Sequence, residues 1–133
     1  MAGIINKDED LGIKVIPKKG VAFAKILHVP KLGRTTILLS LSRYSNTGVV
    51  IALVTVYPVH TTSKVIVNYI HGSKNTSDNY SVKMYYVIES DESISLYVTT
   101  ANYEDCGYRV ISNYLGDTAI SEVASVPDGV VQI

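Results

Sequence analysis

The sequence lacks tryptophan and net charge, and it has one phenylalanine and one cysteine, Cys106. A single cysteine cannot form an intrachain disulfide, so packing and hydrogen bonds must hold the fold. No activating base lies near Cys106 in the sequence, and we interpret it as a structural thiol rather than a nucleophile. Twelve Lys and Arg balance twelve Asp and Glu. Without a basic stripe, we expect no nucleic-acid partner.

Long hydrophobic runs are also missing. No apolar run approaches the ~18 residues that a membrane-spanning helix needs, and we expect no membrane insertion. Residues 1–10 contain no apolar core of signal-peptide length and no periodicity, so we interpret them as an arm or linker. Residues 11–133 suit one domain with one hydrophobic core.

Motifs for catalysis and metal binding are scarce. His28, His60 and His71 have no histidine or cysteine partner at i, i+2 or i, i+4, so no tight metal-ligand cluster is predicted. There is no Gly-x-Ser-x-Gly elbow and no Gly-rich phosphate loop. The acidic pairs Asp91–Glu92 and Glu104–Asp105 fall in expected turns, and we interpret them as solvated turn residues. We expect neither an enzyme nor a cofactor.

What the sequence does have is a series of short runs rich in β-branched residues, together with ten tyrosines. Most runs alternate apolar and polar residues with the period of two that is typical of half-buried strands. Polar turn-forming segments separate them. About eight to ten such strands predict an all-β fold, an antiparallel β-sandwich of jelly-roll-like type. Helical spacing is weak everywhere, and residues 118–125 are its best short candidate.

Alternation assigns faces in two of these runs. Within residues 21–29 it places on one face Val21, Phe23, Leu27 and Val29. Within residues 93–99 the inward side chains are Ile94, Leu96 and Val98. The outward side chains there are Ser93, Ser95, Tyr97 and Thr99.

The run from Val49 to Val56 is apolar on both faces. It is bounded by Gly48 and Pro58 and is too short for a buried helix, which favours a strand that is covered on both sides. The domain's own core can cover one face, and we expect neighbouring copies to cover the other. If the chain itself covers the face formed by Val50, Ala52, Val54 and Val56, this argument for assembly is lost.

Three polar loops combine an aromatic ring or a lysine with amide, carboxylate and hydroxyl groups. Sugars are bound by such sets, because a flat ring stacks on the sugar's C–H face while the polar groups bind its hydroxyls. Ordinary turns have the same composition. The candidate ligand-binding residues are Tyr44, Asn46, Lys74, Asn75, Asp78, Asn102, Tyr103 and Asp105.

Two stretches carry a resemblance to a known family. Residues 33–57 are an alternating strand, a polar loop and a second apolar strand, and residues 93–112 read SISLYVTTANYEDCGYRVIS. This layout resembles the C-terminal head domains of bacteriophage tail fibres and related receptor-binding proteins. The resemblance implies a homotrimeric β-sandwich on a virion tail, whose distal loops bind a bacterial surface glycan or protein. It implies no catalytic residues.

Other classes of protein share these features. In the tail-fibre family a long shaft precedes the head, whereas here only about ten to twenty residues precede the first expected strand, so we expect either an excised domain or a short protein that docks elsewhere. A carbohydrate-binding module of a secreted enzyme would show a row of exposed aromatic side chains and a monomer, and the lack of tryptophan weakens it. A purely structural virion component fits the sequence equally well. A small polysaccharide-degrading enzyme would depend on Asp91, Glu92, Glu104 or Asp105.

Overall fold

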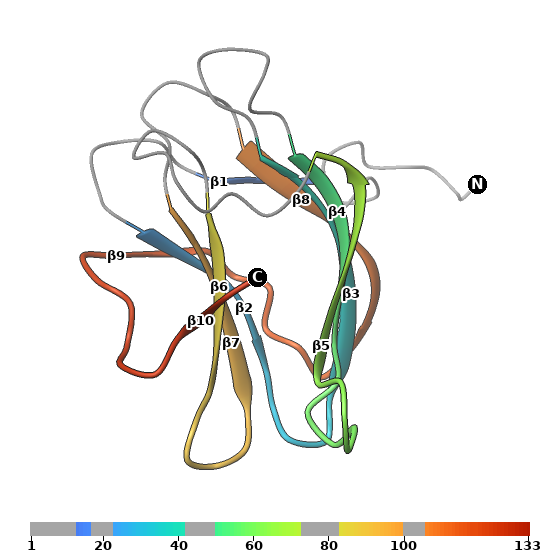
Figure 1. The fold of residues 1–133 in the computed structure, drawn as a ribbon, viewed down its shortest axis with the longest axis vertical. Helices are drawn as coiled ribbons and strands as arrows, with labels where there is room; N and C mark the ends of the chain where they lie inside the picture. Colours follow the sequence, from blue (N-terminus) through green and yellow to red (C-terminus); the bar gives the residue numbers. More distant parts are fainter. Residues whose placement is uncertain (1–12, 17–22, 42–49, 73–82, 100–105) are drawn as a thin grey trace.

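The structure is a computed structural model that describes residues 13–16, 23–41, 50–72, 83–99 and 106–133. These residues form ten strands, and none of them is helical. The strands make two antiparallel sheets of five strands, which lie face to face with the hydrophobic core between them (Figure 1). The expected all-β, antiparallel class is confirmed. In the described part of the chain, no helix is long and apolar enough to cross a membrane.

The first sheet, here called sheet A, contains in spatial order β1 (Ile13–Ile16), β8 (Cys106–Tyr114), β3 (Arg34–Leu41), β4 (Val50–Val56) and β5 (Val65–His71). The second sheet, here called sheet B, contains in spatial order β10 (Val131–Gln132), β6 (Met84–Ile88), β7 (Ile94–Thr99), β2 (Phe23–Val29) and β9 (Ser121–Val123).

Strand β4 confirms the two-sided apolar pattern and corrects its interpretation. Ala52, Val54 and Val56 have no exposed surface, and Val50 packs against the same core. The chain's own sheet B covers this face, so the argument that it needs neighbouring copies is wrong. On the opposite face of β4, Ile51 and Leu53 are half-buried on the outside of sheet A.

A bulge in β2 corrects the face assignment made from alternation. Lys25 pairs with Tyr97 and Leu27 pairs with Leu96, so Ile26 is an extra residue in β2. Ile26 and Leu27 are both buried. The bulge shifts the alternation by one residue, and Phe23 therefore lies on the opposite face from Leu27.

The outer face of sheet B is also covered, which the sequence did not indicate. Ser95 and Tyr97 face away from the core, yet they are 0% and 6% exposed. At Ser95, the side chains of His28 and Glu89 contact the hydroxyl. The C-terminal segment leaves β9 at one edge of sheet B and returns to β10 at the other edge (Figure 1). The helical spacing of residues 118–125 is misleading, because β9 lies there.

Tyr108 connects the two sheets across the core. Its side chain is 2% exposed, and its hydroxyl lies 2.7 Å from the carbonyl oxygen of Ile26 and 2.5 Å from that of Thr118. Ile26 is the bulge residue and has no partner on β7 or β9. The hydroxyl therefore satisfies a carbonyl that the bulge leaves outside the ladder, and buried carbonyls need such partners.

Replacing Tyr108 with phenylalanine tests this connection. The ring remains, but the carbonyls of Ile26 and Thr118 lose their donor, and an unsatisfied buried acceptor costs about 1–3 kcal/mol. We expect Tyr108→Phe to lower the free energy of unfolding in urea by that amount. Tyr114→Phe, at an exposed position on the same strand, is the matched control and should have no measurable effect. Equal stability of the two variants would contradict the role of the hydroxyl.

Alkaline pH should act on the same contact. Burial, and then the negative charge of Asp117, raises the pKa of Tyr108 above its ordinary value. In the unfolded chain Tyr108 ionises near pH ~10, whereas in the folded chain it stays protonated at higher pH. Stability from this residue is present below pH ~10 and is lost above it. We expect the free energy of unfolding to fall above that pH, and to fall less steeply in Tyr108→Phe than in Tyr114→Phe. Identical slopes would contradict the assignment.

Candidate functional site

The predicted ligand-binding residues lie outside the described residues. Tyr44 and Asn46 fall in 42–49. Lys74, Asn75 and Asp78 fall in 73–82, and Asn102, Tyr103 and Asp105 fall in 100–105. What the structure does describe is the framework of strand ends from which these three loops start and to which they return.

The strand ends that flank the three loops meet at one end of the two sheets. Leu41, the last residue of β3, pairs with Val50, the first of β4. His71 at the end of β5 pairs with Ile51, and Cys106 at the start of β8 pairs with Ile16. In sheet B, Thr99 at the end of β7 pairs with Phe23 at the start of β2 (Figure 1). The topology thus brings together the attachment points of all three candidate loops.

The opposite end of the sandwich is closed by short, hydrogen-bonded turns. Lys31 in the β2–β3 turn forms an ion pair of 2.7 Å with Glu92 in the β6–β7 turn. The Lys64 Nζ donates to the carbonyls of Pro58 and His60 at 2.6 and 3.0 Å. Between β4 and β5 the His60 Nδ1 accepts from two backbone N–H groups. The named polar and charged side chains at this end therefore hold the turns in place.

Asp91 and Glu92 lie in one of these turns and act as its structural residues. Asp91 accepts hydrogen bonds from the backbone and hydroxyl of Ser93, at 3.0 and 2.5 Å, and these bonds lower the pKa of Asp91. The hydrogen bond and charge of Lys31 lower the pKa of Glu92. A general acid needs a raised pKa, so both carboxylates have the wrong shift for that role. Glu104 and Asp105 lie outside the described residues.

A polar cluster on sheet B joins three residues that are far apart in the sequence: His28, Ser95 and Glu89. The His28 Nδ1 lies 2.8 Å from the Ser95 Oγ, and that Oγ donates to the Glu89 Oε2 at 2.5 Å. The His28 Nδ1 is 3.3 Å from the same carboxylate oxygen. Because the Ser95 proton points to Glu89, the contact with His28 requires Nδ1 to carry a proton as donor.

This order of groups does not suit nucleophilic catalysis. In a hydrolase triad the imidazole lies between the hydroxyl and the carboxylate and takes the hydroxyl proton. Here the Ser95 hydroxyl donates to the Glu89 carboxylate rather than to the imidazole, the carboxylate oxygen contacts both other groups, and Ser95 is fully buried. The cluster instead ties β2 and β7 to the residue after β6, and Asp117 adds two backbone hydrogen bonds to His28, at 2.7 and 2.9 Å.

No metal centre is present among the described residues, which contain no group of three or more His, Cys, Asp or Glu side chains suited to holding an ion. His28 lies in β2, His60 in the β4–β5 connection and His71 at the end of β5. Cys106 is buried at the start of β8 and packs in the core.

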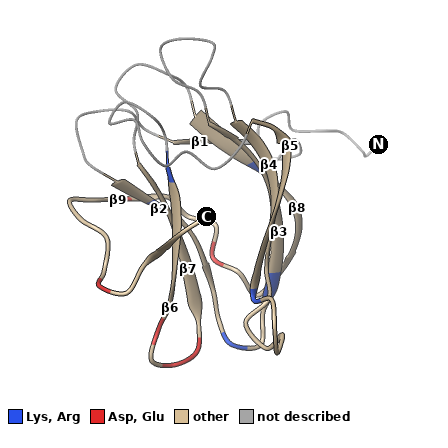
Figure 2. Ribbon diagram, viewed as in Figure 1, with Lys and Arg blue, Asp and Glu red and all other residues tan. Residues whose placement is uncertain are grey.

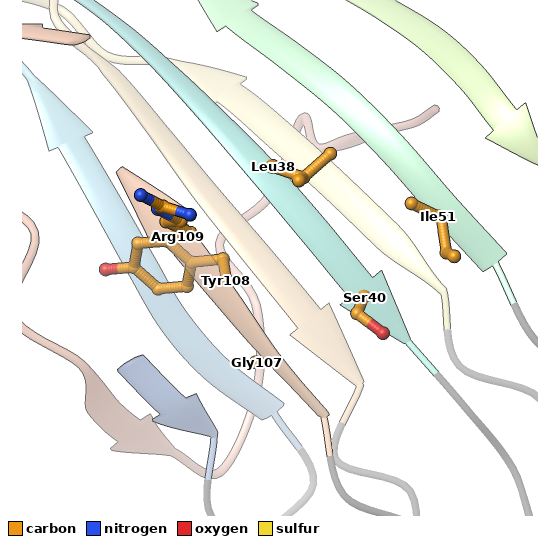
Figure 3. Close-up of a pocket in the computed structure, with 6 residues that line it drawn as sticks. All are labelled: Leu38, Ser40, Ile51, Gly107, Tyr108 and Arg109. Atoms are coloured by element: carbon orange, nitrogen blue, oxygen red, sulfur yellow. The ribbon is translucent and has the colours of Figure 1, made fainter. Parts of the chain in front are cut away.

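The outer face of sheet A contains an open hollow of about 370 Å³ over Gly107 (Figure 3). Gly107 allows β8 to approach β1 closely at this point, since a Cβ there would come within 2.6 Å of the Lys14 carbonyl oxygen on β1. The residues around the hollow are Leu38, Ser40, Ile51, Gly107, Tyr108 and Arg109. The sequence analysis did not predict this hollow. Two patterns could have indicated it: the outward-facing residues of β3 and the second apolar face of β4.

Comparison with protein-family models, with curated proteins and with solved structures finds no match. A proposal of function therefore rests on the geometry and chemistry of this chain and on the sequence resemblance given above.

The His28, Ser95 and Glu89 arrangement yields a direct prediction. A fluorophosphonate probe labels serine hydroxyls that are exposed and activated by a base. We expect the folded protein to remain unlabelled, because the Ser95 hydroxyl is buried and donates to Glu89. Intact-mass spectrometry measures the adduct, and Ser95→Ala controls for reaction elsewhere. An adduct on the native protein that Ser95→Ala abolishes would show that the cluster is a nucleophilic site.

Proposed function

We propose that this chain is a head domain of the bacteriophage tail-fibre kind, which binds a glycan or protein on a bacterial surface through loops. One observation supports this most. The strand ends bordering the three candidate loops all lie at one end of the sandwich. Binding residues are often found on loops that start from one rigid scaffold. The scaffold fixes where the loops lie, while the loop sequences can vary.

Assembly and connectivity form a second part of the proposal. The head is a homotrimer on a virion tail, as the resemblance implies. The sandwich is of jelly-roll-like type, which is supported by β8 lying between β1 and β3 in sheet A while β7 lies beside β2 in sheet B. The order β8-β3-β4-β5 also resembles a Greek key, in which three hairpin-linked strands are flanked by a strand returning along a longer path.

The alternative of a carbohydrate-binding module finds less support. A flat binding face needs a row of exposed rings. On the outer face of sheet B, Phe23 and Tyr85 are half-buried and pack edge to face at 6.1 Å, and Tyr97 is buried. The described outer face of sheet A is instead dominated by aliphatic side chains. The binding surface of the proposed head is therefore the loop-bearing end.

Loop variants test the proposed function. We expect the fluorescently labelled protein to bind some members of a panel of bacterial strains or of a glycan array. Tyr44→Ala, Asn75→Ala and Tyr103→Ala each remove one candidate contact, and loss of a central contact weakens binding about tenfold. Thr61→Ala, an exposed change at the opposite end, is the matched control. Binding that none of the three loop variants weakens, or no binding to any strain or glycan, would contradict the proposal.

A further inference from the structure

One edge of β8 is only partly covered by a partner strand in the described part of the chain. β3 pairs with β8 along one edge, but β1 pairs with the other edge only between Cys106 and Arg109. Residues 110–114 therefore have an open edge on the β1 side. Side chains of this stretch are also exposed, with Ile111 at 53% and Tyr114 at 64%. The open edge of a strand presents unpaired N–H and C=O groups, to which a further strand can be added.

The open stretch starts at the point where β1 starts. Ile13, the first residue of β1, pairs with Arg109, so the residue before Ile13 is next in line to pair with β8. If the register of β1 continues unchanged, residues 12 to 8 come opposite residues 110 to 114, and Leu11 comes opposite the exposed Ile111. Five residues span ~17 Å at about 3.3 Å each, and twelve residues precede β1. The chain before β1 is therefore long enough to cover this edge.

This segment is better placed to cover the edge than a strand from another molecule. Residue 12 is bonded to Ile13, so an extension of β1 closes no new loop and has the high effective concentration of an intramolecular contact. A strand from another molecule would lose translational freedom on binding and would have to avoid the chain that leads into β1. Connectivity therefore selects the chain's own residues.

Charge favours the same segment. The described strands of sheet A contain three basic residues and no acidic one, as Figure 2 shows; the basic residues are Lys14, Arg34 and Arg109. Residues 8–10 read Asp-Glu-Asp. These carboxylates would approach a sheet of opposite charge, although at a distance of one or two strand spacings the attraction is modest. Charged side chains on an outermost strand also protect a sheet from pairing with other molecules.

We propose that residues 8–12 extend β1 as an antiparallel strand along the open edge of β8. Ile16 pairs with Cys106 at the end that bears the candidate loops, whereas Tyr114 pairs with Arg34 at the opposite end. The chain before residue 8 therefore leaves the sandwich at the end away from the loops. This consequence deepens the proposed function and rests on it: the head is attached at one end and binds at the other.

A disulfide across the new strand pair tests the placement. The continued register places Asp10 opposite Ser112, and side chains of directly opposite residues lie close enough to be bridged. In a Cys106→Ala background and a glutathione buffer, we expect Asp10→Cys with Ser112→Cys to form a disulfide within one molecule. Intact mass and non-reducing electrophoresis measure it. Asp10→Cys with Asn68→Cys is the control and should stay reduced, because Asn68 is exposed on β5 at the other edge of sheet A.

Hydrogen exchange in the presence of the native cysteine is a second measurement. Proline has no N–H and interrupts a strand ladder. Asp10→Pro with Leu11→Pro removes two adjacent donors, one of which points toward β8 in an extended strand. We expect alternate amides of residues 110–114 to exchange at least about tenfold faster in this variant than in the wild type. Ala2→Pro with Gly3→Pro changes the same number of residues outside the proposed strand and should leave this exchange unchanged.

Each contrary result has a distinct meaning. If the cysteine pair stays reduced in the folded protein, or if the proline pair leaves exchange of residues 110–114 unchanged, residues 8–12 do not occupy this edge. A disulfide that forms only between two molecules would show that the arm of another copy binds there, and the proposal for one chain would be wrong. All these positions lie outside the three candidate loops. Strain binding by the loop variants therefore tests the proposed function separately, and a disulfide without strain binding would overturn that function alone.

Discussion

The hydrogen bonds of one tyrosine hydroxyl determine how the two sheets fit together. Tyr108 extends from sheet A through the core to the carbonyl of Ile26, the extra residue of the β2 bulge. The bulge redirects β2 so that Ile26 and Leu27 are both buried and His28 faces outward. The same hydroxyl reaches the carbonyl of Thr118, where the chain returns from sheet A to sheet B. A single polar group thus links the core, the bulge and the start of the C-terminal segment.

The sequence predicted the strands well because alternation is a local signal. All-β class and the two-sided apolar pattern of β4 follow from residues next to one another in the chain. The bulge at Ile26 was not predictable, because it depends on a partner 82 residues away. Nor was the burial of the outward-facing Tyr97, which depends on the neighbouring strands β2 and β6 being brought beside β7. For the candidate site, the composition was enough to predict which loops could bind a ligand. That the strand ends bordering these loops lie together could be known only from the strand order of the two sheets.

Charge division between the sheets likewise has no local sequence signature. The full chain is neutral, with twelve positive and twelve negative side chains, and the basic and acidic residues are interleaved along it. Strand order sorts them, because β1, β3 and β8 lie together in sheet A while the acidic β6–β7 turn and β9 belong to the other layer. The whole chain is therefore neutral although the described strands of sheet A contain basic and no acidic residues.

The nested order of strand pairing has a kinetic consequence. β8 pairs with β1 through Arg109 and Ile13, and with β3 through Tyr108 and Leu39, so central ladders of sheet A join segments far apart in sequence. Chains dominated by such distant contacts fold in milliseconds to seconds, slowly for their size. Until β8 pairs with it, one edge of the eight-residue strand β3 has unpaired backbone N–H and C=O groups, which can serve as a template for another strand. During synthesis and refolding this template is open to intermolecular pairing, so yield should depend more on protein concentration and chaperone supply than on final stability.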